Sequence, residues 1–185
     1  MNPVLRFEFS SGFQGAVVWG DLLTIGLESE VAFTLGADLP ARATPYSQEE
    51  VAASIRSMHP SIEVVNGHVR GWLNRPIAWV MADNGTDGPL VLGPPVERWH
   101  GIDRPNIPVT LIANGEVVRE GRGGNALGDP PNVMIWLVNK RSREGEGMSA
   151  GRVVNTGTTA GIYFAEPGGA AVADFGPLGQ ISLTF

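Results

Sequence analysis

The chain of 185 residues contains no cysteine. This absence excludes disulfide bridges, thiolate catalysis, and zinc or iron–sulfur centres with cysteine ligands. Any metal site in this chain must therefore use oxygen or imidazole ligands.

Basic residues are also scarce, since 13 lysines and arginines stand against 19 aspartates and glutamates, for a net charge of -6. This balance argues against a nucleic acid or an anionic membrane as partner. No stretch approaches the roughly 18 apolar residues of a membrane span, and residues 1–10 lack the layout of a signal peptide. We expect a cytoplasmic protein that acts on a small molecule.

Glycine and proline, by contrast, are abundant and occur throughout the sequence. The 25 glycines and 14 prolines predict many short elements joined by turns. Hydrophobic residues make up 43% of the chain, as in ordinary globular proteins. We expect one domain over residues 1–185 with a sizeable core.

Two segments have the features of helices. In residues 46–58, Ser47 and Glu50 have the spacing of a capping box ahead of apolar residues at helical intervals. In residues 130–145, a proline suits the first turn and Gly145 ends the run. These are the two main helices that we expect.

Most of the remaining sequence alternates in polarity or is rich in β-branched residues, which predicts strands. The runs are residues 23–35, 61–69, 77–82, 90–93, 109–121, 152–158 and 180–185. Asn114-Gly115 is a strong signal for a hairpin turn. The expected fold class is α+β, mostly β, without regular βαβ alternation.

The stretch GLESEVAF at residues 26–33 raises the question of function. Successive strand residues point to opposite faces, so Glu28 and Glu30 should share a face with Cα atoms about 7 Å apart. Two carboxylates at this spacing can hold one cation. A solvated strand face is the alternative, because glutamate is mostly exposed in proteins.

A third glutamate favours the cation. Glu63 stands between Ile62 and Val64 in a β-rich run, where a lone buried carboxylate would be costly. Three such carboxylates indicate a hard divalent site, since Mg²⁺ and Mn²⁺ prefer oxygen ligands and keep positions open for substrate. A chelating oxyacid would suit those open positions.

Six segments, in order and covering nearly the whole chain from about Ile25 to Phe185, carry a family resemblance. They read GLESEVAFTLGADLP, PSIEVVNGHV, ADNGTDGPLVLGPP, NGEVVREGRGGNALGDPPNVMIWLVN, GRVVNTGTTAG and ADFGPLGQISLTF. Together they resemble the fumarylacetoacetate hydrolase superfamily, in particular its branch of 2-keto-4-pentenoate hydratases and 4-oxalocrotonate decarboxylases. The resemblance implies a mixed β-roll with a few helices.

The resemblance also implies the site. The metal ligands, for Mg²⁺ or Mn²⁺, would be Glu28, Glu30 and Glu63. The substrate carboxylate would be bound by Thr156, Gly157 and Thr158. The alternative is that these three residues only end a strand and have no part in binding.

The resemblance leaves the general base open. Asp83 and Asn84 would place substrate or water, with a simple turn as the alternative. Family members supply an active-site lysine from a portion before the paired glutamates, whereas the only lysine here is Lys140, in the second expected helix. We therefore expect a catalytic domain that lacks the usual N-terminal portion.

The activity implied is a metal-dependent hydratase of 2-hydroxy-2,4-dienoates in the catabolism of aromatic compounds. The alternatives are decarboxylation of a 2-oxo-3-enedioate, hydrolysis of an acylpyruvate, and a non-catalytic subunit that binds oxo acids. The small-molecule partner would be a 2-oxo or 2-hydroxydienoic acid. The protein partner would be a second copy in a homo-oligomer or a full-length paralogue, with Trp72, Trp79 and Trp99 assigned either to an interface or to the core.

Overall fold

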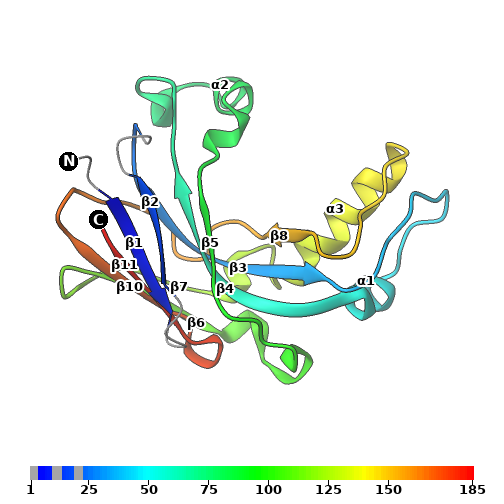
Figure 1. Ribbon diagram of the computed structural model, residues 1–185. Helices are drawn as coiled ribbons and strands as arrows, with labels where there is room; N and C mark the ends of the chain where they lie inside the picture. Colours follow the sequence, from blue (N-terminus) through cyan, green and yellow to red (C-terminus); the bar gives the residue numbers. More distant parts are fainter. Residues whose placement is uncertain (1–3, 10–13, 19–22) are drawn as a thin grey trace.

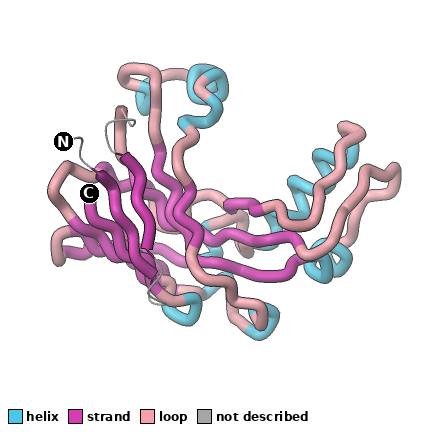
Figure 2. The backbone as a smooth tube through the Cα atoms, viewed as in Figure 1, coloured by secondary structure: helices cyan, strands magenta, loops and turns pink. Residues whose placement is uncertain are grey.

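Two antiparallel sheets make up most of the computed structural model, which describes residues 4–9, 14–18 and 23–185 (Figures 1 and 2). One sheet has the strand order β2-β1-β11-β10-β6-β7, and the other has the order β5-β4-β3-β8 with β9 paired to β3. The strands are β1 Val4–Phe9, β2 Gln14–Val18, β3 Gly26–Leu35, β4 Ile55–Val65, β5 Leu90–Leu92, β6 Pro108–Ala113, β7 Glu116–Arg122, β8 Val153–Asn155, β9 Ile162–Phe164, β10 Ala170–Asp174 and β11 Gln180–Thr184. The expected class, mostly β, is confirmed.

The helices lie at the edges of this body, with α1 and α3 beyond one end of the five-stranded sheet (Figure 1). Their bounds are α1 Gln48–Ser54, α2 Ile77–Ala82 and α3 Pro131–Arg143. Helix α3 begins and ends as predicted, with Pro131 in its first turn and Gly145 at a positive φ just after it. None of the helices in the described residues is long and apolar enough to cross a membrane.

Helix α1 is shorter than the predicted 46–58. Its capping box is present, since Ser47 Oγ accepts from the Glu50 N–H at 3.2 Å and the Glu50 carboxylate accepts from the Ser47 N–H at 2.8 Å. The helix ends at Ser54, however, and β4 begins at the next residue. Pairing with β3 buries Ile55 and Met58. The stabilisation from this burial outweighs the helical preference that their spacing indicates.

Residues 77–82 form helix α2, so the strand predicted there is wrong. The run is short and apolar, and such a run does not distinguish strand from helix by periodicity alone. Pro76 precedes its first turn, and the Asp83 N–H donates to the Trp79 carbonyl at 3.0 Å. The helix sits on an arm that stands away from both sheets (Figure 1).

The predicted hairpin is confirmed between β6 and β7. Asn114 and Gly115 both have positive φ, 51° and 85°, as a type I′ turn requires.

A single hydrophobic cluster draws its side chains from both sheets. Trp99 is 1% exposed and packs edge-to-face on Phe33 at 5.5 Å between ring centroids, so it belongs to the core. Trp79 is 51% exposed, and Trp72 makes an edge contact with Phe164. The three tryptophans therefore have different settings, and the core explanation holds for Trp99.

Candidate functional site

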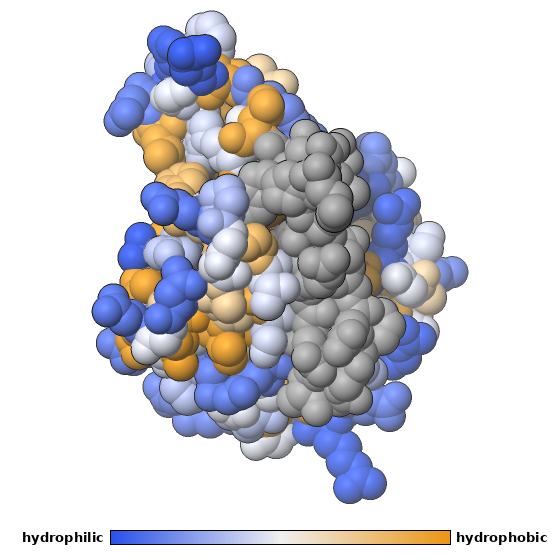
Figure 3. Space-filling model, turned by 60° about the vertical axis from the view of Figure 1, so that its left-hand side comes forward, coloured by the Kyte–Doolittle hydropathy of each residue, from blue (hydrophilic) through white to orange (hydrophobic). Residues whose placement is uncertain are grey.

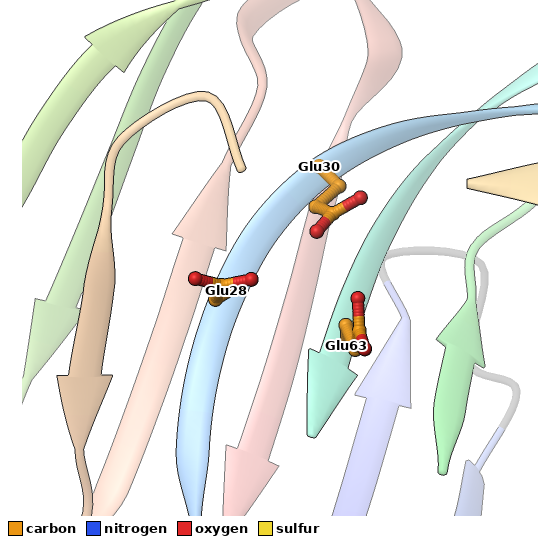
Figure 4. A group of neighbouring side chains, drawn as sticks. All are labelled: Glu28, Glu30 and Glu63. Atoms are coloured by element: carbon orange, nitrogen blue, oxygen red, sulfur yellow. The ribbon is translucent and has the colours of Figure 1, made fainter. Parts of the chain in front are cut away.

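Three glutamates converge on one face of the five-stranded sheet (Figure 4). Glu28 and Glu30 project from β3, as strand alternation predicts, and Glu63 projects from β4. The antiparallel register sets Glu28 directly opposite Glu63 and Glu30 opposite Ser61. One carboxylate oxygen of each glutamate lies within 4.8 Å of those of the other two.

Glu30 is the most enclosed of the three. Only 1% of it is exposed, so the alternative of a solvated strand face is wrong for this residue. Its Oε2 accepts a hydrogen bond of 2.6 Å from the Gly157 N–H. Its Oε1 receives no hydrogen bond from any N–H or O–H group of the described residues. A buried carboxylate oxygen without a donor is costly and calls for a missing ligand.

Burial raises the pKa of all three carboxyl groups above the ordinary value of 4.5. The pKa of Glu30 rises to about 9, because repulsion from Glu63 and Glu28 adds to its burial and the hydrogen bond from Gly157 offsets only part. The charge of Glu63 likewise adds to the effect of burial on the pKa of Glu28. Carboxylates in this arrangement repel one another unless a proton or a cation lies between them.

The end of β8 orients two of the three glutamates. Besides the Gly157 N–H on Glu30, the Asn155 side-chain amide approaches Glu63 Oε2 at 3.5 Å. Ser61, fully buried on β4, donates to Asn155 Oδ1 at 2.7 Å and so turns the amide nitrogen toward Glu63. The sequence interpretation missed Asn155 and Ser61. Only the alternation of residues 61 and 63 could have pointed to Ser61.

The three residues predicted to bind a substrate carboxylate follow Asn155 directly. Thr156 is buried and donates its hydroxyl to the Val31 carbonyl at 2.7 Å, and Gly157 donates its N–H to Glu30. Thr158 accepts from the Gly161 N–H at 2.9 Å, and its own hydroxyl hydrogen has no acceptor among the described residues. Of the three, Thr158 is thus the one with a free donor.

Asp83 and Asn84 lie on the arm after α2. Asp83 accepts from the His68 N–H at 2.7 Å and pairs with the His68 ring at 3.1 Å, and Asn84 donates to Asp87 at 3.1 Å. Within the described residues, neither side chain hydrogen-bonds to the glutamate cluster. Burial is the main cause of the raised pKa of Glu63, and the negative charge of Asp87, on the same arm, raises it further.

The sequence GMSAG at residues 147–151 matches the spacing of a nucleophile elbow. Ser149 is exposed in the loop between α3 and β8, which is the reverse of the strand–turn–helix order that an elbow requires. Both ring nitrogens of the buried His59 are in hydrogen bonds: Nε2 with the hydroxyl groups of Ser57 and Thr34, and Nδ1 with the Gly93 carbonyl. No serine–histidine pair for nucleophilic hydrolysis therefore forms at this loop among the described residues.

The residues of the cluster fit a hard divalent cation. All three donors are carboxylates, which Mg²⁺, Mn²⁺ and Ca²⁺ prefer over nitrogen or sulfur. Their oxygens are close enough to share one ion, and the buried Glu30 Oε1 would gain the partner that it lacks. Such an ion would also offset the repulsion from Glu63 that adds to burial in raising the pKa values of Glu28 and Glu30.

Relatives of this sequence are named as hydratases. The chain is 31% identical over 182 residues to 2-keto-4-pentenoate hydratase 1 of Dechloromonas aromatica, covering 98% of this chain and 68% of that protein. It is 29% identical over 175 residues to the 2-keto-4-pentenoate hydratase of Paraburkholderia xenovorans. The match covers 90% of this chain and spans 64% of the length of that relative.

Among solved structures, the fold is similar to 4-oxalocrotonate decarboxylase from Pseudomonas putida G7, complexed with magnesium and adipate. The TM-score is 0.78 at 25% identity, and the match covers 88% of this chain and 61% of that one. The same enzyme complexed with calcium and acetate matches with a TM-score of 0.76.

The family comparison covers almost the entire sequence. Residues 12–185 match the family described as fumarylacetoacetate (FAA) hydrolase C-terminal. The two antiparallel sheets agree with the fold of the solved structure of 4-oxalocrotonate decarboxylase. The chain belongs to the fumarylacetoacetate hydrolase C-terminal family.

Proposed function

We propose that the chain binds Mg²⁺ or Mn²⁺ through Glu28, Glu30 and Glu63 and hydrates 2-hydroxy-2,4-dienoates. The observation that carries the proposal is the buried Glu30 carboxylate, whose Oε1 lacks a donor among the described residues while two further carboxylates lie beside it. The hydratase names of relatives at about 30% identity support the reaction class.

Bound in this cluster, a divalent cation would supply Lewis-acid stabilisation to the enolate charge of a chelated 2-oxo acid. The Gly157 N–H holds Glu30 Oε2 in place and leaves Oε1 for the cation. Asn155 and Ser61 orient Glu63 in the same way. The free hydroxyl hydrogen of Thr158 is the donor proposed for the substrate carboxylate.

The proposed reaction needs no reactant other than the dienoate and water. One water adds to 2-hydroxypenta-2,4-dienoate to give 4-hydroxy-2-oxopentanoate, with the hydroxyl on the fourth carbon and no change of oxidation state overall. Asp83 and Asn84 are the candidates for placing this water, although His68 and Asp87 engage them in the present arrangement.

Decarboxylation of a 2-oxo-3-enedioate is the second candidate. The similarity to 4-oxalocrotonate decarboxylase, with its TM-score of 0.78, favours it. The same stabilisation of enolate charge would serve the loss of carbon dioxide.

Ultraviolet absorbance of freshly generated 2-hydroxypenta-2,4-dienoate tests the proposal directly. We expect decay with Mg²⁺ or Mn²⁺, no decay with a chelator, and loss of the decay in Glu30→Gln. Carbon dioxide release from 4-oxalocrotonate without dienoate decay would select the second candidate. Failure of the purified protein to bind either cation would refute both.

The exposed helix α2 supports a further proposal, that the chain forms homo-oligomers or pairs with a full-length paralogue. All six residues of α2 are apolar and none is buried, and the arm that carries it shows apolar side chains at its surface (Figure 3). Ile77 and Met81 are each 72% exposed. A helix that is apolar on all sides is normally covered by other parts of a protein or by a partner chain.

Sedimentation of the Trp79→Glu variant, compared with the Trp136→Glu variant on α3, tests this proposal. Only Trp79→Glu should reduce the mass of the assembly.

A further inference from the structure

The residues just before β5 continue the pairing of β5 with β4 at the edge of the five-stranded sheet (Figure 1). The Val64 N–H donates to the Pro89 carbonyl at 2.9 Å. Two residues further along, the Asn66 N–H donates to the Thr86 carbonyl at 2.9 Å. A single residue, Val65, lies between the two donors, whereas two residues lie between the two acceptors. The segment before β5 therefore has one extra residue, as in a β-bulge.

The two residues of this bulge are Asp87 and Gly88. A Cβ at Gly88 would collide with the Val64 carbonyl oxygen, so glycine allows the two segments to come this close. Counted back from Leu90, which is opposite Glu63, strict alternation would turn Asp87 away from the glutamates. The extra residue breaks this alternation, because both bulge residues stand opposite one residue of β4 that shares the face of Glu63.

Asp87 is therefore close to the glutamate cluster without belonging to it. Its place in the pairing is about 7 Å along β4 from Glu63 and about 5 Å across from that strand. Burial raises the pKa of Glu63, and the negative charge of Asp87 raises it further, as expected at this separation. Asp87 is not among the carboxylates whose oxygens lie within 4.8 Å of one another. Its position suits contact with a substrate bound at the cluster rather than with the cation.

The carboxylate of Asp87 is held on one side and open on the other. Its Oδ2 accepts from the Asn84 side-chain amide at 3.1 Å, and its Oδ1 receives no hydrogen bond from the described residues. Asp87 is exposed, and Leu90 beside Glu63 is 39% exposed, so this edge of the site is open to substrate and water. A carboxylate with one oriented oxygen and one free oxygen can accept a proton and release it.

The two histidines of the neighbouring chain segment are already engaged. Both ring nitrogens of the buried His59 are in hydrogen bonds. Both ring nitrogens of His68 also have neighbours, since Nδ1 pairs with Asp83 at 3.1 Å and Nε2 lies 3.2 Å from the Asn66 amide nitrogen. Asp87 is therefore better placed than either histidine to accept a proton at this edge of the sheet.

We propose that Asp87 is the general base of the hydration. The inference rests on the proposed function, which supplies the bound 2-oxo acid. It deepens that function by naming the side chain that moves the proton.

The step starts from a 2-oxo-3-enoate, which a 2-hydroxy-2,4-dienoate forms by moving one proton from its hydroxyl oxygen to its fifth carbon. The Asp87 carboxylate takes one proton from water as the water oxygen bonds to the fourth carbon. The electron pair of the double bond between the third and fourth carbons shifts to give an enolate. The third carbon then takes the proton from the Asp87 carboxylic acid, which restores the carboxylate and leaves a 4-hydroxy-2-oxo acid.

Kinetics of Asp87 variants with 2-hydroxypenta-2,4-dienoate test this role. We expect Asp87→Asn to lower kcat by about 10²–10⁴-fold, with KM and Mn²⁺ affinity within about twofold of the native values. Asp87→Glu, which keeps a carboxylate, should recover part of kcat. Asp103→Asn is the matched control, because Asp103 is an exposed aspartate between β5 and β6 that likewise accepts from an asparagine amide, that of Asn106, at 2.9 Å.

Proton exchange in an unreactive acid tests Asp87 separately from hydration. The same base would remove a proton from the third carbon of bound 2-oxobutanoate. In heavy water with Mg²⁺, we expect these protons to exchange for deuterium with the native protein and with Asp103→Asn. The rate in Asp87→Asn should fall at least about tenfold, as measured by proton nuclear magnetic resonance.

The outcomes separate the two proposals. Exchange that depends on Asp87 supports the inference even if no dienoate is hydrated, in which case only the hydratase proposal fails. Hydration at the native rate in Asp87→Asn, or exchange that persists in it, overturns the role of Asp87 alone. Loss of Mn²⁺ affinity together with kcat makes Asp87 part of the cation site and also overturns the inference. Absence of both hydration and exchange with the native protein overturns both proposals.

Discussion

Glu28 on β3 stands directly opposite Glu63 on β4, two acidic residues in a cross-strand pair on a largely buried face. Like charges at opposed strand positions destabilise a sheet. The sequence therefore retains an arrangement that opposes folding in the absence of a ligand. A bound cation would make the same arrangement stabilising. The free energy of unfolding, measured with and without the cation, therefore reports cation binding at the site.

Removal of one member of the pair should separate stability from metal binding. At pH about 9, where about half of the Glu30 side chains are ionised, we expect Glu63→Gln to raise the unfolding free energy of metal-free protein by on the order of 0.5 kcal/mol. The same variant should lose the rise in melting temperature that Mg²⁺ gives the native protein. Thermal unfolding with Mg²⁺ and with a chelator measures both.

Glu116→Gln is the control for that comparison, because Glu116 is an exposed strand carboxylate on β7, opposite Ala113. It should change neither quantity. If Glu63→Gln keeps the full response to Mg²⁺, Glu63 is not a ligand.

The raised pKa of Glu30 predicts how stability depends on pH. Between its ordinary value of 4.5 and about 9, the folded state keeps a proton that the unfolded state has lost, so unfolding releases this proton. The stability of metal-free protein from this group therefore falls as pH rises through the window. Magnesium competes with the proton, so its affinity should rise with pH over the same range.

Melting temperatures measured across this window should show a gap between Mg²⁺ and chelator that widens toward alkaline pH. In chelator, Glu30→Gln should remove part of the decline with pH. A gap that stays constant from acid to alkaline pH would contradict the assignment of Glu30.

We expect the hydrogen bond from the Gly157 N–H to Glu30 to contribute to metal affinity. This effect is separate from the effect of the Gly157 backbone conformation on stability. Gly157 has a φ of 89°, and an added Cβ would meet nothing within 4 Å. Gly157→Ala should therefore cost about 1–2 kcal/mol of stability through the left-handed backbone. Relaxation of that strain moves the N–H away from Glu30, and we expect Mn²⁺ affinity to fall about tenfold.

Gly151→Ala provides a matched comparison, since Gly151 also has a positive φ, 82°, and open space for a Cβ. Its stability loss should be similar and its Mn²⁺ affinity native, as measured by electron paramagnetic resonance titration. Equal affinity in the two variants would show that the Gly157 contact has no part in holding the metal.

Ser61 should act on the site through Asn155. Ser61→Ala removes the donor that fixes the Asn155 amide, so the amide can rotate away from Glu63. We expect Mn²⁺ affinity to fall by about tenfold, the low end of the range for groups that orient ligands. Ser61→Thr, which keeps the hydroxyl, should recover most of it.

Ser57→Ala is the control here, because Ser57 is equally buried on the same face of β4 but bonds to His59. Loss of stability without loss of affinity in Ser61→Ala would assign Ser61 a purely structural role.

Local sequence rules were reliable where the interaction is local. The capping box of Ser47 and Glu50 and the hairpin at Asn114 follow from contacts within a few residues. They failed at residues 55–58 and 77–82. Ile55 and Met58 follow a helical spacing but gain more from pairing with β3, and the apolar run of α2 has no strand partner among the described residues.

The sequence by itself determined that Glu28 and Glu30 share a face, because side chains alternate along any strand. It also supplied three carboxylates and no cysteine, a donor set that suits a hard divalent cation. Only the tertiary structure decided that Glu63 meets Glu28 and that the Gly157 N–H, 127 residues from Glu30, meets its carboxylate. Those contacts depend on the register of strands distant in sequence, and register is set by the packing of the whole sheet rather than by any local pattern.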